Sequence, residues 1–144
     1  MHFSDEIPRH VVSLSDALTA AELPFAFGAA VALGQAAIND PREPPDIDVH
    51  VFIDRSDAAM VLAALPDDLP RTADFADSLL FSGYGVLAGS PPLIEVILRG
   101  ASADARDRVE LRHLAAGTSV PVLALQDVRA WRSRGAPEQT GPGE

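Results

Sequence analysis

Two aspartates separated by one residue are the first group in the sequence with a spacing suited to chemistry. Asp46 and Asp48 open the segment Asp46–Ile53, in which polar and aliphatic residues alternate at the start. Alternation is typical of a strand, and it directs both carboxylates to one face with their Cβ atoms about 6.5 to 7 Å apart. Side chains at that separation can converge on metal ions.

A third carboxylate interrupts a second, otherwise apolar segment. Glu95 lies within Pro92–Leu98, and a buried carboxylate without a partner is costly, so we expect an arginine, solvent or a metal ion to compensate it. Magnesium fits best, because it prefers oxygen ligands and is usually held by one or two carboxylates plus substrate phosphates. Taken singly, each motif has an ordinary reading as well. An Asp-x-Asp pair is commonly solvated surface, and a lone glutamate commonly faces water on an edge strand.

A glycine turn offers a place for an anion beside these carboxylates. The short apolar strand 25–27 stops at Gly28, and residues 29–37 are rich in helix formers. Because glycine has no side chain, a substrate can approach the backbone closely there. A helix beginning near Ala29 would aim free amides and the positive end of its dipole at an anion. Carboxylate-bound magnesium beside such a turn is typical of a site for a nucleoside triphosphate.

The composition of the 144-residue chain restricts the chemistry further. Twenty-one acidic against eleven basic residues give a net charge of -10, which disfavours non-specific nucleic-acid binding. The absence of cysteine excludes disulfides, thiolate metal sites and cysteine nucleophiles. The basic residues, all arginine, are concentrated from Arg99 onward. Guanidinium groups from that part could line an acidic site in the first part, although a solvated helix face would give the same charge distribution.

The remaining pattern predicts the elements that position these residues. We expect helices over 8–22, 29–37, 58–65, 101–108 and 125–134, the first ended by Leu23-Pro24 and the third capped by side chains of 54–57. We expect strands over 25–27, 46–53, 92–98, 109–114 and 119–124, and a hairpin over 79–87 bent at Gly83 and Gly85. Together they predict one α/β domain over 1–134, with a mixed, partly antiparallel sheet, helices packed mainly on one face, and a disordered tail over 135–144.

The sequence contains no signal for membrane insertion or export. No run approaches the length of a bilayer span, and Met1–Arg9 lacks the cationic region and apolar run of a secretion signal. We therefore expect a cytoplasmic protein with no membrane partner.

The ordered motifs resemble the polymerase-β-like nucleotidyltransferase superfamily. Its signature is an apolar residue before a Gly-Gly or Gly-Ser turn, an acid-apolar-acid strand and a third acid on a later strand. The corresponding residues are Phe27-Gly28-Ala29, Asp46-Ile47-Asp48 and Ile94-Glu95-Val96. A closer likeness is to small bacterial nucleotidyltransferases related to toxins of type IV toxin-antitoxin systems. Their run "AFGGALAL...EPRxTxDIDVNVFV" is similar to residues 26–33 and 40–53, and their "IPVLSxEDLxxxK" is similar to residues 120–132.

The resemblance, which covers about residues 18–134, implies a fold, an activity and a set of site residues. It implies a nucleotidyltransferase fold and transfer of a nucleoside monophosphate from a triphosphate to a hydroxyl group on protein or RNA, with release of pyrophosphate. Asp46, Asp48 and Glu95 would be the catalytic residues and the ligands of Mg²⁺. The nucleotide-binding residues would be Gly28, Ala29, Arg42 and Arg132. A cognate antitoxin or further copies of the chain are the expected macromolecular partners.

The departures from the family pattern keep a second reading open. Ala29 replaces the second glycine or serine, Pro44 stands where threonine is common, Arg132 replaces the lysine, and the gap over 30–45 is longer than usual. The alternative is therefore a degenerate, non-catalytic module that binds a nucleotide or a protein partner. His50 shares the aspartate face but lies about 13 Å from Asp46, too far to share its magnesium, and we expect it to support the site from outside the ligand set.

Overall fold

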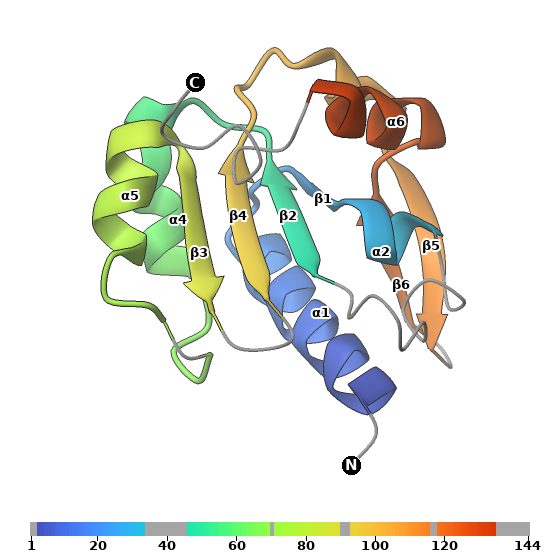
Figure 1. The fold of residues 1–144 in the computed structure, drawn as a ribbon, viewed down its shortest axis with the longest axis horizontal. Helices are drawn as coiled ribbons and strands as arrows, with labels where there is room; N and C mark the ends of the chain where they lie inside the picture. The colour runs from blue at the N-terminus through green and yellow to red at the C-terminus, as the bar shows by residue number, and fades with distance from the viewer. Residues whose placement is uncertain (1–2, 34–45, 70, 90–92, 116–117, 135–144) are drawn as a thin grey trace.

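One six-stranded sheet determines the positions of the acidic side chains. The computed structural model describes residues 3–33, 46–69, 71–89, 93–115 and 118–134. The strands are β1 (Phe25–Phe27), β2 (Ile47–Val51), β3 (Tyr84–Ala88), β4 (Ile94–Leu98), β5 (Glu110–Ala115) and β6 (Thr118–Val122). They are ordered β3-β4-β2-β1-β6-β5 (Figure 1). The pairs β2–β4 and β1–β6 are parallel and the other neighbours antiparallel, so the predicted mixed α/β sheet is confirmed.

Helices lie on both sides of this sheet. They are α1 (Phe3–Ala20), α2 (Ala29–Leu33), α4 (Ala58–Ala64), α5 (Phe75–Ser82) and α6 (Leu125–Arg134), with 3-10 turns η1 (Arg55–Asp57) and η2 (Asp104–Arg108). In Figure 1, α1 crosses behind the sheet, whereas α2 and α6 lie in front of it. We expected helices mainly on one face, and α2 and α6 show that the second face is also covered.

The first helix is longer at its start and shorter at its end than predicted. Its buried face consists of Val11, Leu14 and Leu18, which follow the helical period. Glu22, with a φ of 59°, follows the helix in the left-handed conformation, and the N–H of Leu23 bonds to the carbonyl of Leu18 at 3.0 Å. This closure of the last turn is a Schellman motif. The helix therefore ends through backbone geometry, and not at the Leu23-Pro24 step.

The predicted hairpin over 79–87 is wrong in its first half. Phe75 and Leu79, four residues apart, are both buried and lie on one face of α5. Gly83, with a φ of 77°, ends that helix in the left-handed conformation, which glycine adopts without strain. Gly83, which we expected to bend a hairpin, is thus a helix cap. Within the segment 79–87, the strand is formed by the β3 residues alone.

Two further predictions need correction. Residues 101–108 form a 3-10 turn over Asp104–Arg108 in place of a full helix. The side chains of Asp54 and Asp57 do not cap α4, and Asp54 Oδ1 instead accepts a 3.1 Å hydrogen bond from the N–H of Ala101. Asp54 therefore connects the start of η1 to the segment after β4.

The other predicted elements agree with the structure, or lie outside the part that it describes. The β5, β6, α4 and α6 segments occur where expected. The continuation of α2 past Leu33 and the predicted tail over 135–144 are outside the described residues. Across the described ranges, none of the helices has the length and apolar character needed to cross a membrane.

Candidate functional site

Four neighbouring strands place Val86, Glu95, Asp48 and Gly28 in one row across the sheet. Asp48 is directly opposite Glu95 in the parallel β2–β4 pair, and Glu95 is opposite Val86 in the antiparallel β3–β4 pair. On the other side, the N–H of Gly28 donates to the carbonyl of Asp48 at 2.9 Å. Residues opposite one another share a face, and the strands are about 4.7 to 4.9 Å apart. The structure thus brings Asp48 and Glu95 together.

Asp46 lies at the entrance to β2 and has no such counterpart in the ladder. It precedes the first strand residue, Ile47, and its side chain is exposed. Within the described residues, no group of three or more histidine, aspartate or glutamate side chains is placed to hold a metal ion. The pair of carboxylates that the register does bring together is chemically suited to magnesium, because one or two carboxylates suffice when substrate phosphates supply the other ligands.

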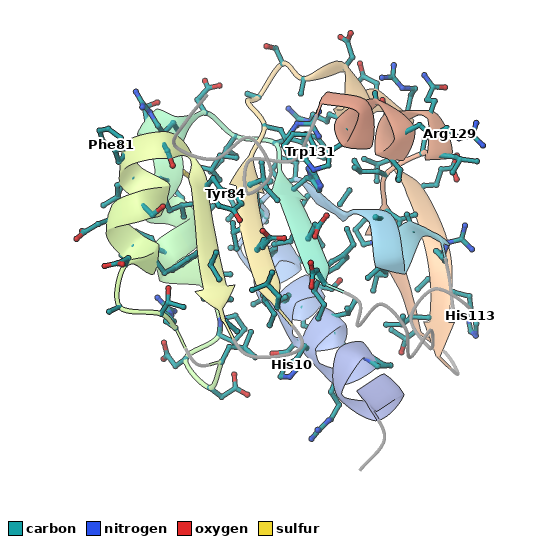
Figure 2. All side chains as sticks on the ribbon, in the orientation of Figure 1. His10, Phe81, Tyr84, His113, Arg129 and Trp131 are labelled. Atoms are coloured by element: carbon teal, nitrogen blue, oxygen red, sulfur yellow. The ribbon has the colours of Figure 1, made fainter. Side chains whose placement is uncertain are left out.

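Glu95 is buried and held by a tyrosine that the sequence reasoning missed. Only 3% of Glu95 is exposed. The hydroxyl of Tyr84 donates a hydrogen bond to Glu95 Oε2. Tyr84 is two residues before Val86 on β3, so it shares the face of Glu95 and reaches it diagonally across the β3–β4 pair (Figure 2). We expected an arginine, solvent or a metal to compensate the burial of this carboxylate. The hydroxyl group of Tyr84 compensates part of it through this hydrogen bond.

Gly28 is required by close packing against two side chains of β2. A Cβ atom added to Gly28 would lie 2.9 Å from His50 Nε2 and 3.1 Å from Asp48 Oδ2. Real Cβ atoms essentially never come within 3.0 Å of another atom, so a side chain here would require the His50 ring to move, and the Asp48 carboxylate would be unusually close. The glycine therefore sets the position of the Asp48 carboxylate, and close approach of a substrate to its backbone stays a prediction.

His50 is fully buried and neutral. Burial, and secondarily the charge of Arg99, lower the pKa of His50 from 6.5 to about 3. Arg99 Nη1 lies 3.1 Å from His50 Nδ1. Because a guanidinium only donates, Nδ1 accepts and the ring proton is on Nε2. Among the described residues His50 Nε2 has no hydrogen-bond partner, and a supporting role of His50 at the site stays a prediction.

Arg99 and Trp131 join the last helix to the carboxylate face. The guanidinium carbon of Arg99 is 4.8 Å from the centroid of the Trp131 ring, and that ring meets His50 edge-on at 5.0 Å. Figure 2 shows Trp131 on the side of α6 that faces the strands. Arg99 follows β4 four residues after Glu95, on the same face. Arg99 thus places a guanidinium from the later part of the chain beside the acidic strands, which is one of the two arrangements that the charge distribution allowed.

A bidentate ion pair holds the same helix at its first turn. Arg108 donates from Nε and Nη2 to the two carboxylate oxygens of Asp127, at 2.9 and 2.6 Å. The hydrogen bonds that Arg108 donates to Asp127 raise the pKa of Arg108 above its ordinary value. Two arginines therefore position α6 relative to the sheet.

The other predicted site residues are less closely tied to this row. Ala29 is the first residue of α2, directly after Gly28, and is half-buried. Arg132 belongs to α6, but its side chain lies outside what the structure describes, as does Arg42 entirely. The structure therefore brings together Gly28, Asp48 and Glu95, and adds Tyr84, His50, Arg99 and Trp131 around them.

Comparison with models of protein families and with curated proteins returned no match. The function is therefore argued from the geometry of the site.

Proposed function

We propose that the protein is a magnesium-dependent nucleotidyltransferase that transfers a nucleoside monophosphate from a triphosphate to a hydroxyl group on protein or RNA. The observation that carries the proposal is the register of β2 and β4, which pairs Asp48 with Glu95 on one face. Like charges directly opposite on neighbouring strands are destabilising. A cation bound by both carboxylates, one of them buried, would relieve this repulsion.

The side chains would have separate roles. Asp48, which is half-buried, and Glu95 would bind magnesium, and substrate phosphates would supply further oxygen ligands. Bound magnesium supplies positive charge for the triphosphate and lowers the pKa of the attacking hydroxyl. Tyr84 holds Glu95 Oε2 in place, and Gly28 holds Asp48 by packing against it. Rigid side chains of this kind keep the reacting groups aligned.

The reaction itself is a displacement at the α-phosphorus. The oxygen of the acceptor hydroxyl forms a bond to that phosphorus, and the bond from the phosphorus to the oxygen that bridges to the β-phosphate breaks. Pyrophosphate leaves with the bonding electrons, and the hydroxyl proton passes to Glu95 or to solvent.

The direct test is incubation of the protein with magnesium, each radiolabelled ribonucleoside triphosphate and a cell extract. We expect a labelled protein or RNA, and a loss of labelling by about a hundredfold or more in Asp48→Asn and Glu95→Gln. Asp57→Asn is the matched control, because Asp57 is an exposed carboxylate on η1 outside the row and its loss should leave labelling unchanged. Equal labelling by wild type and Asp48→Asn would contradict the assignment.

Calorimetry separates the enzyme from the non-catalytic alternative. Magnesium-dependent binding of a triphosphate without any labelled product would support a degenerate module that binds a nucleotide. No heat with any of the four triphosphates would contradict the nucleotide site and favour a module that binds a protein partner.

A further inference from the structure

Among the described residues, strand β5 forms one edge of the sheet. It is the last strand in the order β3-β4-β2-β1-β6-β5 and pairs only with β6 among the described residues. The side chains of residues 110–113 are exposed on both faces of the strand, and Leu111 is 76% exposed. Figure 2 shows His113 at the outer margin of the sheet. An edge strand carries backbone groups that another strand can bind.

The ladder shows which backbone groups point outward. The N–H of Leu123 bonds to the carbonyl of Phe27 on β1, and alternation therefore directs Val122 and Val120 toward β5. Their partners are Glu110 and Arg112, whose own backbone groups are used in the β5–β6 pair. The N–H and C=O groups of the alternate β5 residues, Leu111 and His113, consequently face the open edge.

We propose that this edge pairs in antiparallel orientation with β5 of a second copy of the chain, with the twofold axis at Leu111. In this register the two leucines face each other, and Glu110 lies opposite Arg112 of the partner subunit. Opposite charges across a strand pair stabilise it, and like charges destabilise it. An axis at Glu110 would place two glutamates opposite each other, and an axis at Arg112 would do so for two arginines. The charge pattern thus selects the register centred on Leu111.

The same residues have another conceivable role, as charges that keep an edge strand from pairing. Charges that only prevent pairing can be of either sign at any position. Pairing with a second copy requires opposite charges at equal distances on either side of the twofold axis. The sequence Glu110-Leu111-Arg112 has that complementarity, and it surrounds the most exposed leucine of the described chain. Two six-stranded sheets would then continue into each other across the interface.

Sedimentation equilibrium from micromolar to millimolar protein tests the pairing. We expect a reversible dimer whose dissociation constant rises on the order of tenfold or more in Arg112→Glu, because both cross-strand pairs become repulsive. The double variant Glu110→Arg/Arg112→Glu restores opposite charges and should restore the wild-type constant. Arg129→Glu is the control, since it makes the same charge change at an exposed arginine that belongs to α6 and not to β5. A wild-type monomer at millimolar concentration, an unaffected Arg112→Glu dimer, or a double variant that fails to recover would each overturn the proposal.

Cross-linking tests the register independently. The chain contains no cysteine, and Leu111→Cys would place the two introduced thiols opposite each other, within the Cα separation of about 4.4 to 6.8 Å that a disulfide needs. His113→Cys is the matched control, because its two copies would lie about 13 Å apart along the strands. We expect a covalent dimer on a non-reducing gel for Leu111→Cys alone. Equal cross-linking of both variants, or of neither, would contradict an axis at Leu111.

Discussion

The N–H of Gly28 donates a 2.9 Å hydrogen bond to the carbonyl oxygen of Asp48, while the Asp48 side chain packs over the same glycine. Backbone and side chain of one aspartate are therefore both fixed by one residue of the neighbouring strand. This contact extends the β1–β2 pair beyond Phe27–Val49, up to the start of α2. A Cβ atom on Gly28 would therefore crowd the carboxylate of Asp48.

We expect Gly28→Ala to lower the free energy of unfolding by about 1 to 3 kcal/mol, as overpacking does. It should also weaken magnesium-dependent triphosphate binding, because the methyl group must displace Asp48 or His50. Gly89→Ala is the control, since a Cβ there meets Thr72 Cγ2 at an ordinary 3.6 Å. Urea unfolding and calorimetry measure the two effects, and similar losses in both variants would contradict the packing role of Gly28.

We expect Tyr84→Phe to destabilise the fold by about 1.5 to 3 kcal/mol, the range for hydrogen bonds to charged groups. The hydroxyl that it removes binds the buried Glu95. In a Glu95→Gln background the same change should cost about half as much, because the bond is then between neutral groups. A double-mutant cycle from urea unfolding measures the difference, and equal costs in both backgrounds would argue against a charged Glu95 as the partner.

The buried histidine predicts a loss of stability in acid. Burial and the Arg99 charge hold the pKa of His50 at about 3 in the folded state, against 6.5 when unfolded. Below pH 6.5 the unfolded chain therefore binds a proton at His50 that the folded chain does not bind. In the folded chain, Arg99 and the Asp48 carboxylate lie beside the ring. The contribution of neutral His50 to the free energy of unfolding is complete above pH 6.5. It falls by up to about 1.4 kcal/mol per pH unit between pH 6.5 and pH 3.

The measurement is the free energy of unfolding at pH 7 and pH 5 for wild type and His50→Gln. Carboxylates change stability in both proteins, so the difference between them reports His50. Wild type should lose about 2 kcal/mol more than the variant over that interval. Parallel pH profiles would show that His50 is not the group that titrates.

The left-handed residue after α1 predicts a stabilising substitution. Glu22 has a φ of 59°, a conformation that costs a residue with a side chain about 1 to 2 kcal/mol. Glu22→Gly should therefore raise the free energy of unfolding by about 0.5 to 1 kcal/mol, after the greater freedom of glycine in the unfolded chain is included. Thr19→Gly, inside the last turn of the same helix, should lower it by a similar amount. Thermal unfolding of the two variants in opposite directions is the expected result.

Local patterns were sufficient to predict the strands that carry the carboxylates. Alternation over 46–53 predicts β2 and its two faces, and a lone glutamate among apolar residues marks Glu95 as unusual. Both signals depend on neighbours in the sequence. The wrong assignment over 79–82 has the same origin, because a short apolar segment before a glycine is compatible with either a strand or the end of a helix.

The surroundings of the carboxylates could not be predicted in the same way. Tyr84 reaches Glu95 only because of the β3–β4 register, and Arg99 meets Trp131 only because α6 folds back over β2 and β4. Such contacts join residues far apart in the sequence, and their existence depends on the order of the strands. Charge segregation was equally compatible with late arginines that face the acidic part and with late arginines on a solvated helix face, and it did not single out Arg99.

The short strand β1 has a consequence for the order in which the chain folds. Its three residues connect β2 to β6, and the β1–β6 register contains the single pair Phe27–Val122, which closes one of the longest loops in the sheet. Long loops close late, since their entropy cost is met before their contacts form. During synthesis on the ribosome, β1 and β2 are made well before β6. We therefore expect the carboxylate strands to assemble first, and Arg99 to gain its aromatic neighbour Trp131 only at the final docking of the β5–β6–α6 segment.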